Sequence, residues 1–271
     1  MKKALFNIAW DLNEEDLVAN LLSSHQITGV ELALSKIWPN LERVTKNQIK
    51  EYRDYWNKQG IEIVALCSLL FPHPEMSIFN NFDERVKMLI YLEKIASLGS
   101  QLGAKILVFG SPKNRNYKDI KYDKAVKIAV DFFSQLAEIG KKYEVVFCIE
   151  PIPAEYNTNF INNTTEAVEL VKIVNHPNFQ LHLDSGAMTV NNEDYQESIK
   201  LGLKYLKHFH ISEDFLGEVG KGKVDHQKIA DLLKECNYDG WVSVEMPKKD
   251  GETNNLVKIE RVLRLVERIY R

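Results

Sequence analysis

Four short segments in the second half of the chain each end near a side chain that could bind a metal or move a proton. The segment VVFCIEP carries Glu150, FQLHLDS carries Asp184, LKHFHIS carries His210 and WVSVEM carries Glu245. In each segment apolar residues alternate with polar ones, which is the pattern of a strand with two different faces. We therefore expect three carboxylates and one imidazole to share one face of four successive strands.

Such a group of carboxylates predicts a bound divalent cation. An isolated carboxylate at a strand end usually caps a turn or pairs on the surface, but four residues in the same phase favour a site. Like charges that face one cavity would raise their own pKa values, and a divalent cation removes this conflict. Oxygen-rich ligation with one nitrogen suits Mn²⁺, Mg²⁺ or Co²⁺ better than a structural zinc site. We expect one ion, Mn²⁺ first, with Mg²⁺, Co²⁺ or Zn²⁺ as alternatives.

The elements that must position these residues follow a regular alternation. Eight segments rich in β-branched and aromatic residues alternate with amphipathic helical patterns, at residues 4–10, 29–34, 61–68, 105–111, 145–151, 179–185, 206–212 and 241–246. No linker divides the 271 residues. The pattern predicts a single (β/α)8 TIM barrel domain over residues 1–271, in which strand ends carry the chemistry. A doubly wound open sheet is the alternative, but no glycine-rich fingerprint follows the first segment.

Composition restricts the kind of partner. The chain has 35 basic and 38 acidic residues, a formal charge of −3, which does not favour a nucleic-acid partner. The three cysteines are far apart and form no C-x-x-C pair, as in a reduced cytoplasmic protein. The N-terminus makes a poor signal peptide, and the apolar run IVALCSLLF is too short to cross a bilayer. We expect a cytoplasmic protein with a small-molecule ligand and no membrane partner.

The motifs around the four candidate ligands point to a family. CIEP, HLDSGAM, HFHISED and VSVEM resemble the sugar phosphate isomerase/epimerase superfamily, the xylose-isomerase-like barrels, and most of all its ketose 3-epimerases. The resemblance covers essentially the whole chain, including NIAWD and LVFGSP. It implies that Glu150, Asp184, His210 and Glu245 bind one divalent metal and that Glu150 and Glu245 form the acid/base pair. The implied activity is epimerisation or isomerisation of a sugar or sugar derivative by proton transfer beside a carbonyl, and related barrels often form homo-oligomers.

Three departures from the ketose 3-epimerase pattern limit the inference about substrate. Ala187 stands where those enzymes carry a histidine three residues after the strand-six aspartate. No arginine follows His210 in HISEDFLGEVGKGK. Glu155 is one residue short of the usual position of a sugar-binding glutamate. The metal site is thus better supported than any particular sugar.

Several other residues are candidates for substrate contact. Trp10 and Phe71 follow the first and third strands, Arg115 follows the fourth, and Glu31 should face the barrel interior in a substrate-binding or supporting role. His182 and His208 would lie one layer below the ligands. We favour a structural or supporting role for both over a substrate contact. The full set of candidate substrate contacts is Trp10, Glu31, Phe71, Arg115, Glu155, His182 and Lys221.

The loop GEVGKGKVD, residues 217–225, has two interpretations. Its glycines with Lys221 and Lys223 could hold a phosphate or carboxylate, because barrel phosphate sites often use the loops after strands seven and eight. We favour the alternative, a solvated loop before a helix capped at Asp225, because the sequence is not a P-loop.

Other functions remain open on the same barrel. An inosose-type polyol dehydratase would use similar ligands. A DNA-repair enzyme of the endonuclease IV type would bind three zinc ions with additional histidines, one of them at the position of Ala187, and it would need more basic residues. A barrel that has lost catalysis and only binds a ligand is the third alternative. A count of one metal ion per chain against three separates the isomerase, epimerase or dehydratase from the endonuclease IV type.

Overall fold

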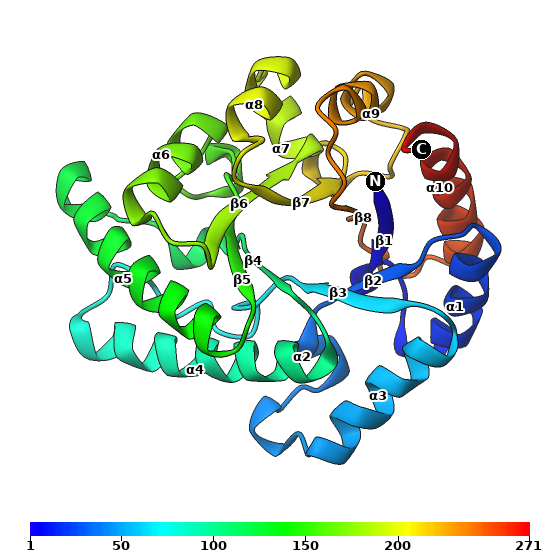
Figure 1. Ribbon diagram of the computed structural model, residues 1–271, viewed down its shortest axis with the longest axis horizontal. Coiled ribbons are helices and arrows are strands. Elements are labelled where there is room, and N and C mark those ends of the chain that lie inside the picture. Colours follow the sequence, from blue (N-terminus) through cyan, green and yellow to red (C-terminus); the bar gives the residue numbers. More distant parts are fainter.

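The computed structural model describes residues 1–271 and shows a closed barrel of eight parallel strands that follow one another in chain order (Figure 1). Strand β8 pairs with β1, with Ser243 opposite Ala4, and so closes the barrel. The predicted (β/α)8 TIM barrel is confirmed. The strands are β1 (Lys2–Phe6), β2 (Gly29–Leu32), β3 (Glu62–Leu66), β4 (Ile106–Phe109), β5 (Val146–Ile149), β6 (Phe179–Asp184), β7 (Leu206–Ile211) and β8 (Trp241–Val244).

Nine of the ten α-helices lie between strands and α10 follows β8, and the longer helices form a layer around the barrel (Figure 1). Their apolar stripes face the sheet, as α5 shows by burying Ala129, Phe132 and Leu136. The two chain ends lie close together, and α1 packs against α10. The helices are α1 (Glu15–Ser24), α2 (Leu34–Ile37), α3 (Lys46–Lys58), α4 (Phe82–Leu102), α5 (Tyr122–Lys142), α6 (Thr164–Val174), α7 (Ser185–Val190), α8 (Tyr195–Gly202), α9 (His226–Glu235) and α10 (Asn255–Ile269).

The observed strands are shorter than the predicted ones at their carboxyl ends. The largest difference is in β1, which ends at Phe6 and not at Trp10 because a turn of 3-10 helix covers Asn7–Ala9. The side chain of Asn7 accepts the backbone N–H of Ala33 at 2.8 Å, so a side-chain amide replaces the next bond of the strand ladder. Prediction from apolar runs alone cannot detect this change of partner.

One hydrophobic core lies on each side of the sheet. The larger one fills the space between strands and helices. The smaller one lies inside the barrel and contains Ala4, Phe6, Val64, Ile106, Val108 and Cys148 among its members. The odd and even positions of β5 therefore point to opposite sides, as predicted, with Phe147 and Ile149 outside and Cys148 inside.

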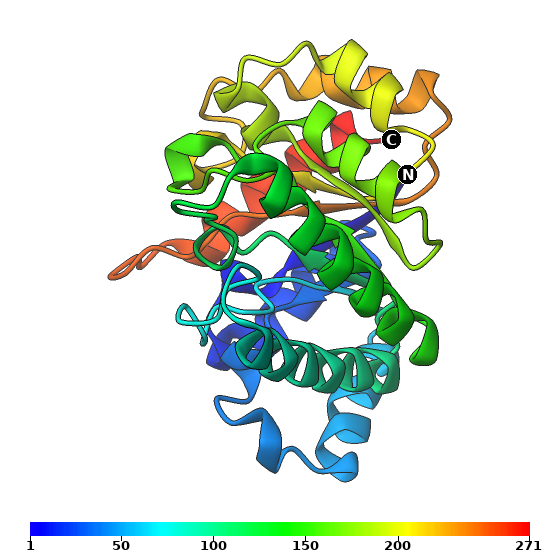
Figure 2. The same cartoon turned by 90° about the vertical axis from the view of Figure 1, so that its left-hand side faces the viewer.

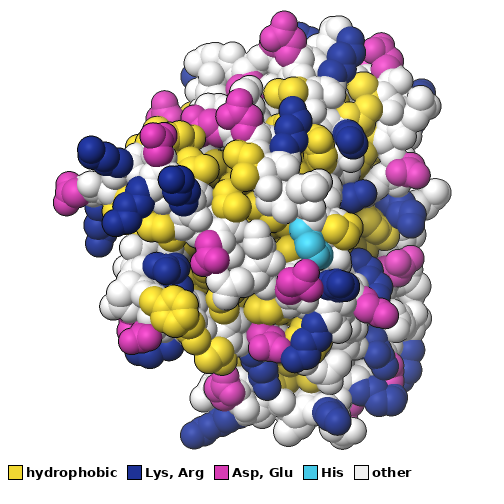
Figure 3. Space-filling view, turned by 60° about the vertical axis from the view of Figure 1, so that its left-hand side comes forward, with side chains coloured by type: hydrophobic (Ala, Val, Ile, Leu, Met, Phe, Trp, Pro, Cys, Tyr) yellow, Lys and Arg dark blue, Asp and Glu magenta, His cyan; other side chains and the backbone are white.

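The segments that follow β3 and β8 emerge on the same side of the barrel (Figure 2). On the face drawn in Figure 3, acidic and basic side chains are interspersed with apolar ones, and no continuous basic surface is seen there. None of the helices combines the length and the apolar composition needed to cross a membrane.

Candidate metal centre

The four predicted ligands converge at the carboxyl ends of β5 to β8. One ligand atom from each of Glu150, Asp184, His210 and Glu245 lies within 4.8 Å of those of the other three. Backbone hydrogen bonds hold the two glutamates just past their strands, because the Glu150 N–H donates to Phe109 O at 3.2 Å and the Glu245 N–H donates to Ile211 O at 3.0 Å. Glu150 and Asp184 are buried, His210 is inaccessible, and Glu245 is the most exposed of the four.

Asp184 is oriented by two hydrogen bonds. Its Oδ1 accepts the backbone N–H of Ala187 at 2.6 Å, so the carboxylate also caps α7. Its Oδ2 accepts the hydroxyl of Ser212 at 2.6 Å, and Ser212 Oγ in turn accepts the N–H of Gly186 at 3.0 Å. Residue 187 thus helps to orient Asp184 through its backbone N–H, and this contact does not use its side chain.

His210 is oriented from below by a carboxylate on the opposite side of the barrel. Its Nε2 lies 3.0 Å from Glu31 Oε2, and its Nδ1 lies 3.2 Å from Glu245 Oε2 and 4.0 Å from Asp184 Oδ2. The same Glu31 oxygen lies 3.2 Å from His208 Nε2. With its Nε2 proton donated to Glu31, His210 can present the Nδ1 lone pair to a cation.

The carboxylate of Glu150 occupies space that is free only because residue 110 is a glycine. A Cβ atom added at Gly110, directly after β4, would lie 2.3 Å from Glu150 Oε2. Real Cβ atoms essentially never approach so closely, so any other residue at this position would displace the carboxylate. The GSP turn after the fourth strand therefore shapes the site through a missing side chain.

The pKa values of the cluster reflect mutual repulsion in a buried place. Burial and the charge of Glu245 raise the pKa of Glu150 well above its usual range. The same two causes raise the pKa of Asp184 to about 6. Burial opposes the protonation of His210, but the charges of Glu31 and Glu245 outweigh it and raise the His210 pKa. A divalent cation would relieve this repulsion, and the donor set of three carboxylates and one imidazole fits such an ion.

A cavity of about 170 Å³ opens above the cluster. Three of the four predicted ligands line it, and His210 lies beneath them. On one wall, Tyr156 stacks on Phe215 with ring centroids 5.5 Å apart and accepts the Phe215 N–H through its hydroxyl at 2.8 Å. The lining residues are Cys67, Ser68, Gly110, Ser111, Pro112, Glu150, Ile152, Pro153, Tyr156, Asp184, Ala187, Glu213, Leu216 and Glu245.

Four of the predicted substrate contacts are buried outside this cavity, namely Trp10, Glu31, Arg115 and His182. Trp10 packs edge-on against Trp56 in the outer core, 6.2 Å between ring centroids, so a substrate contact does not fit its place. His182 lies beneath the cluster, with its ring centroid 4.1 Å from that of His210. Burial lowers the His182 pKa well below its usual value, which keeps the ring neutral.

Arg115 is the most unusual of these buried residues. Its side chain is fully buried, and none of its three guanidinium nitrogens has a hydrogen-bond partner. Burial lowers the Arg115 pKa to about 10, although the charge of Glu150 opposes this shift. Arg115 therefore influences the site through the effect of its buried positive charge on Glu150, and it does not line the cavity.

The other three predicted contacts are exposed. Glu155 points to solvent, and its neighbour Tyr156 lines the cavity instead. Lys221 pairs with Glu218 at 3.2 Å, away from the cavity. Phe71 is 80% exposed and lines an adjoining cavity.

The loop of residues 217–225 wraps around a carboxylate of the chain itself. Glu213 accepts the backbone N–H groups of Gly220 at 2.9 Å and Val224 at 3.2 Å, and it lies 3.0 Å from His226 Nε2. Two of the backbone donors that could have held a phosphate are therefore occupied by Glu213. Asp225 caps α9, as the favoured interpretation predicted, by accepting the N–H of Lys228.

Some residues of the site were not predicted. Ser212 continues the inward phase of His208 and His210, so the alternation carried a signal for it. Gly110 begins the sequence GSP, which is typical of a turn directly after a strand. Tyr156 and Leu216 lie in loops after β5 and β7, where no periodic pattern gives the direction of a side chain.

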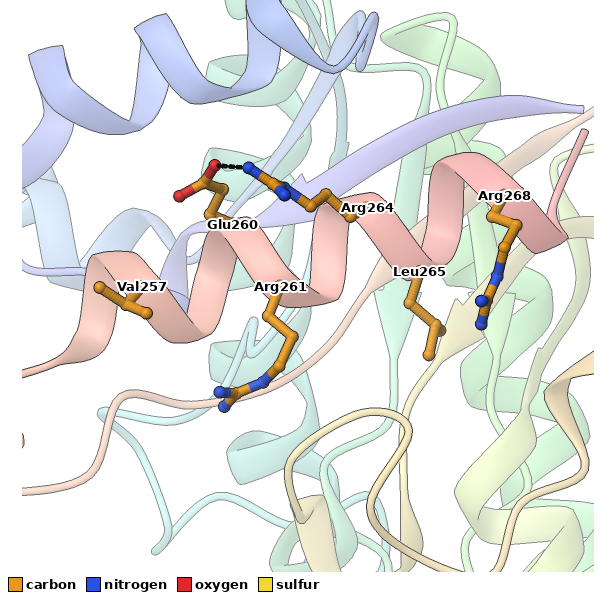
Figure 4. Close-up of a pocket in the computed structure, with 6 residues that line it drawn as sticks. All are labelled: Val257, Glu260, Arg261, Arg264, Leu265 and Arg268. Carbon is orange, nitrogen blue, oxygen red and sulfur yellow. Dashed lines mark hydrogen bonds and ion pairs between the residues drawn. The ribbon is translucent and has the colours of Figure 1, made fainter.

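A larger and more open depression runs along the exposed side of α10 (Figure 4), and it contains no member of this site. Two of its three arginines are paired, Arg261 with Glu218 and Arg264 with Glu260. We therefore take the strand ends, and not this helix, as the candidate site.

Comparison with known proteins agrees with this geometry. D-psicose 3-epimerase of Ruminiclostridium cellulolyticum is 26% identical over 153 residues, which are 54% of this chain and 52% of that protein. The match thus spans about half the length of that relative. Inosose isomerase of Halalkalibacterium halodurans is 27% identical over 262 residues, 90% of this chain and 87% of that protein.

A solved structure shows the same fold over the full length. The crystal structure of D-psicose 3-epimerase with D-tagatose from Clostridium cellulolyticum H10 superposes with a TM-score of 0.83, at 17% identity, covering 100% of both chains. Residues 19–267 match the family described as xylose isomerase-like TIM barrel. With its closed barrel and its converging strand-end residues, the chain belongs to the xylose isomerase-like TIM barrel family.

Proposed function

We propose that this protein is a divalent-metal-dependent epimerase or isomerase of a sugar or sugar derivative. The observation that carries the proposal is the convergence of Glu150, Asp184, His210 and Glu245 at the base of one cavity. The relatives named D-psicose 3-epimerase and inosose isomerase support a keto sugar or keto polyol as the substrate class.

The chemistry follows from the position of the two glutamates. Glu150, Asp184, His210 and Glu245 would hold the metal, which when bound would stabilise negative charge developing on the substrate carbonyl oxygen. Glu150 and Glu245 come from β5 and β8 and both line the cavity. One carboxylate removes the proton from the carbon beside the carbonyl, and the other gives a proton to the opposite face of that carbon, which inverts it. Return of the proton to the former carbonyl carbon would instead interconvert ketose and aldose.

The charge of the cavity supports an unphosphorylated substrate. Its lining contains four carboxylates, from Glu150, Asp184, Glu213 and Glu245, and neither lysine nor arginine. One divalent ion would leave this lining net negative, so a phosphate group placed in it would be repelled. Ala187 lines the cavity where an endonuclease IV type of site would carry an additional histidine, which speaks against that type of site.

Deuterium wash-in from D₂O tests the proposal. The panel holds ketoses, their phosphorylated counterparts and inososes, each with and without Mn²⁺. We expect metal-dependent exchange into an unphosphorylated substrate, reduced about 10²- to 10⁴-fold in Glu150→Gln and in Glu245→Gln. The matched control is Glu155→Gln, since that side chain is exposed and lines no part of the cavity.

Two outcomes would change the account. Unchanged exchange in both cavity variants would contradict the acid/base assignment. Net loss of water from an inosose would identify the dehydratase alternative.

A further inference from the structure

A second cavity continues from the metal centre toward the outside. It measures about 320 Å³ and is lined by Ser68, Leu70, Phe71, Pro74, Ser111, Pro112, Lys113 and Asn114. Ser68, Ser111 and Pro112 line both cavities, so the two are joined along the loops after β3 and β4. The site is therefore a groove with two compartments.

The two compartments differ in chemistry. The inner one holds the four carboxylates. The outer one has no acidic side chain, and its most prominent lining residue is Phe71, with 80% of its surface exposed. An aromatic side chain this exposed has apolar surface that a ligand in the compartment can cover, and covering it is favourable. Lys113, the single cation of the outer compartment, is itself exposed.

The outer compartment is braced from both sides. Asn114 Nδ2 donates to His73 O at 2.8 Å and to Met76 O at 2.7 Å, which ties the loop after β4 to the loop after β3. At the junction, Ser68 and Ser111 both have left-handed backbone angles, with φ of 55° and 46°. Such angles are costly for residues other than glycine and concentrate at ligand-binding segments. The compartment is thus preformed.

We propose that the outer compartment binds an uncharged ring that is attached to the reacting sugar. The sugar would lie over the carboxylate cluster, and its ring substituent would pass the two serines and pack on Phe71. The favoured substrate class is then a keto sugar with a ring substituent and not a free monosaccharide. This inference rests on the proposed function for the position of the sugar and goes beyond it in the size of the substrate.

Binding of two simple probes tests the outer compartment without turnover. Isothermal titration calorimetry in the presence of Mg²⁺ compares phenyl β-D-glucoside with methyl β-D-glucoside. We expect the phenyl compound to bind about tenfold more tightly because its ring covers Phe71. This advantage should disappear in Phe71→Ala. The matched control is Phe82→Ala, since Phe82 is 65% exposed and lines neither compartment.

Each contrary outcome is distinct. Three results would each refute ring binding in the outer compartment. These are equal binding of the two glucosides, no binding of the phenyl compound at millimolar concentration, and a phenyl advantage that survives in Phe71→Ala. Deuterium exchange into a free ketose without phenyl selectivity would leave the proposed function intact and refute this inference. Phenyl selectivity without exchange in any sugar would refute the proposed function alone.

Discussion

The two halves of the barrel differ in what they place inside it. Strands β1 to β4 contribute mainly small or apolar side chains, such as Ala4, Phe6, Val64 and Val108. Strands β5 to β8 and the positions directly after them contribute nearly all of the polar ones, Glu150, His182, Asp184, His208, His210 and Glu245. The second half therefore carries the candidate reactive groups, and the first half determines the space around them.

Two residues of the first half nevertheless act on the second. Glu31 on β2 contacts both His208 and His210 across the barrel. Gly110 after β4 leaves room for Glu150. The comparison shows that a supporting strand can shape the candidate metal centre either through one buried carboxylate or through the absence of a side chain.

Among changes that leave the four candidate ligands themselves intact, the largest effect is expected from adding one carbon atom in the first half. In Gly110→Ala the new Cβ would meet Glu150 Oε2 at 2.3 Å, so the carboxylate must move. We expect Mn²⁺ affinity and deuterium exchange each to fall about 100-fold, because displacements of this size are costly in preorganised sites. The control is Gly217→Ala, where φ is −64° and the nearest atom lies at 3.3 Å. Similar losses in both variants would refute the steric explanation.

A smaller loss is expected when Glu31 can no longer hold both histidines. Glu31→Gln keeps the shape but removes the charge that orients His210. Carboxylates that support a metal-bound histidine typically contribute 10- to 100-fold to affinity, and we expect Mn²⁺ affinity by calorimetry to fall by about this factor. Glu62→Gln, at the exposed start of β3, is the matched control. Equal Mn²⁺ affinity in Glu31→Gln and the wild type would show that His210 needs no such support.

The pH dependence of stability tests the repulsion in the second half. The Asp184 pKa rises on folding from 3.8 to about 6, so the folded state binds the proton more tightly than the unfolded one. With a chelator present, the wild type should lose about 3 kcal/mol of unfolding free energy relative to Asp184→Asn as pH rises from about 3 to about 7. Urea unfolding at several pH values measures the difference. Parallel pH profiles for the two proteins would contradict the buried repulsion.

The smallest effect on the metal centre is expected from an apolar truncation in the first half. Val108 is completely buried inside the barrel, and Val108→Ala should lower the free energy of unfolding by about 2 kcal/mol. Mn²⁺ affinity should change less than threefold, because no ligand contacts are lost. A tenfold loss of affinity would show that the packing of the first half and the metal centre cannot be separated.

The sequence predicted the barrel and the convergence of the four candidate ligands because both depend on local periodicity. Alternation within β5 to β8 decides which side chains point inward, and parallel strands bring their ends to one face. The four residues whose ligand atoms lie within 4.8 Å of one another could therefore be predicted from the pattern of each segment separately.

Loop residues and contacts across the barrel were not accessible in this way. Whether Glu155 or Tyr156 faces the cavity depends on the turn of 3-10 helix at Ala154–Tyr156, which no period reveals. The end of β1 depends on the bond between Asn7 and Ala33, which are distant in sequence. Trp10 resembled a rim residue because the first strand was predicted too long, but it packs in the core on Trp56.

Anomalous diffraction from crystals soaked in Mn²⁺ tests the central claim most directly. The account predicts one anomalous peak per chain, about 2 Å from one atom each of Glu150, Asp184, His210 and Glu245. It also predicts that the peak disappears in Asp184→Ala. No peak among these four residues, or three peaks around the cavity, would contradict the proposal of a single divalent ion at the ends of β5 to β8.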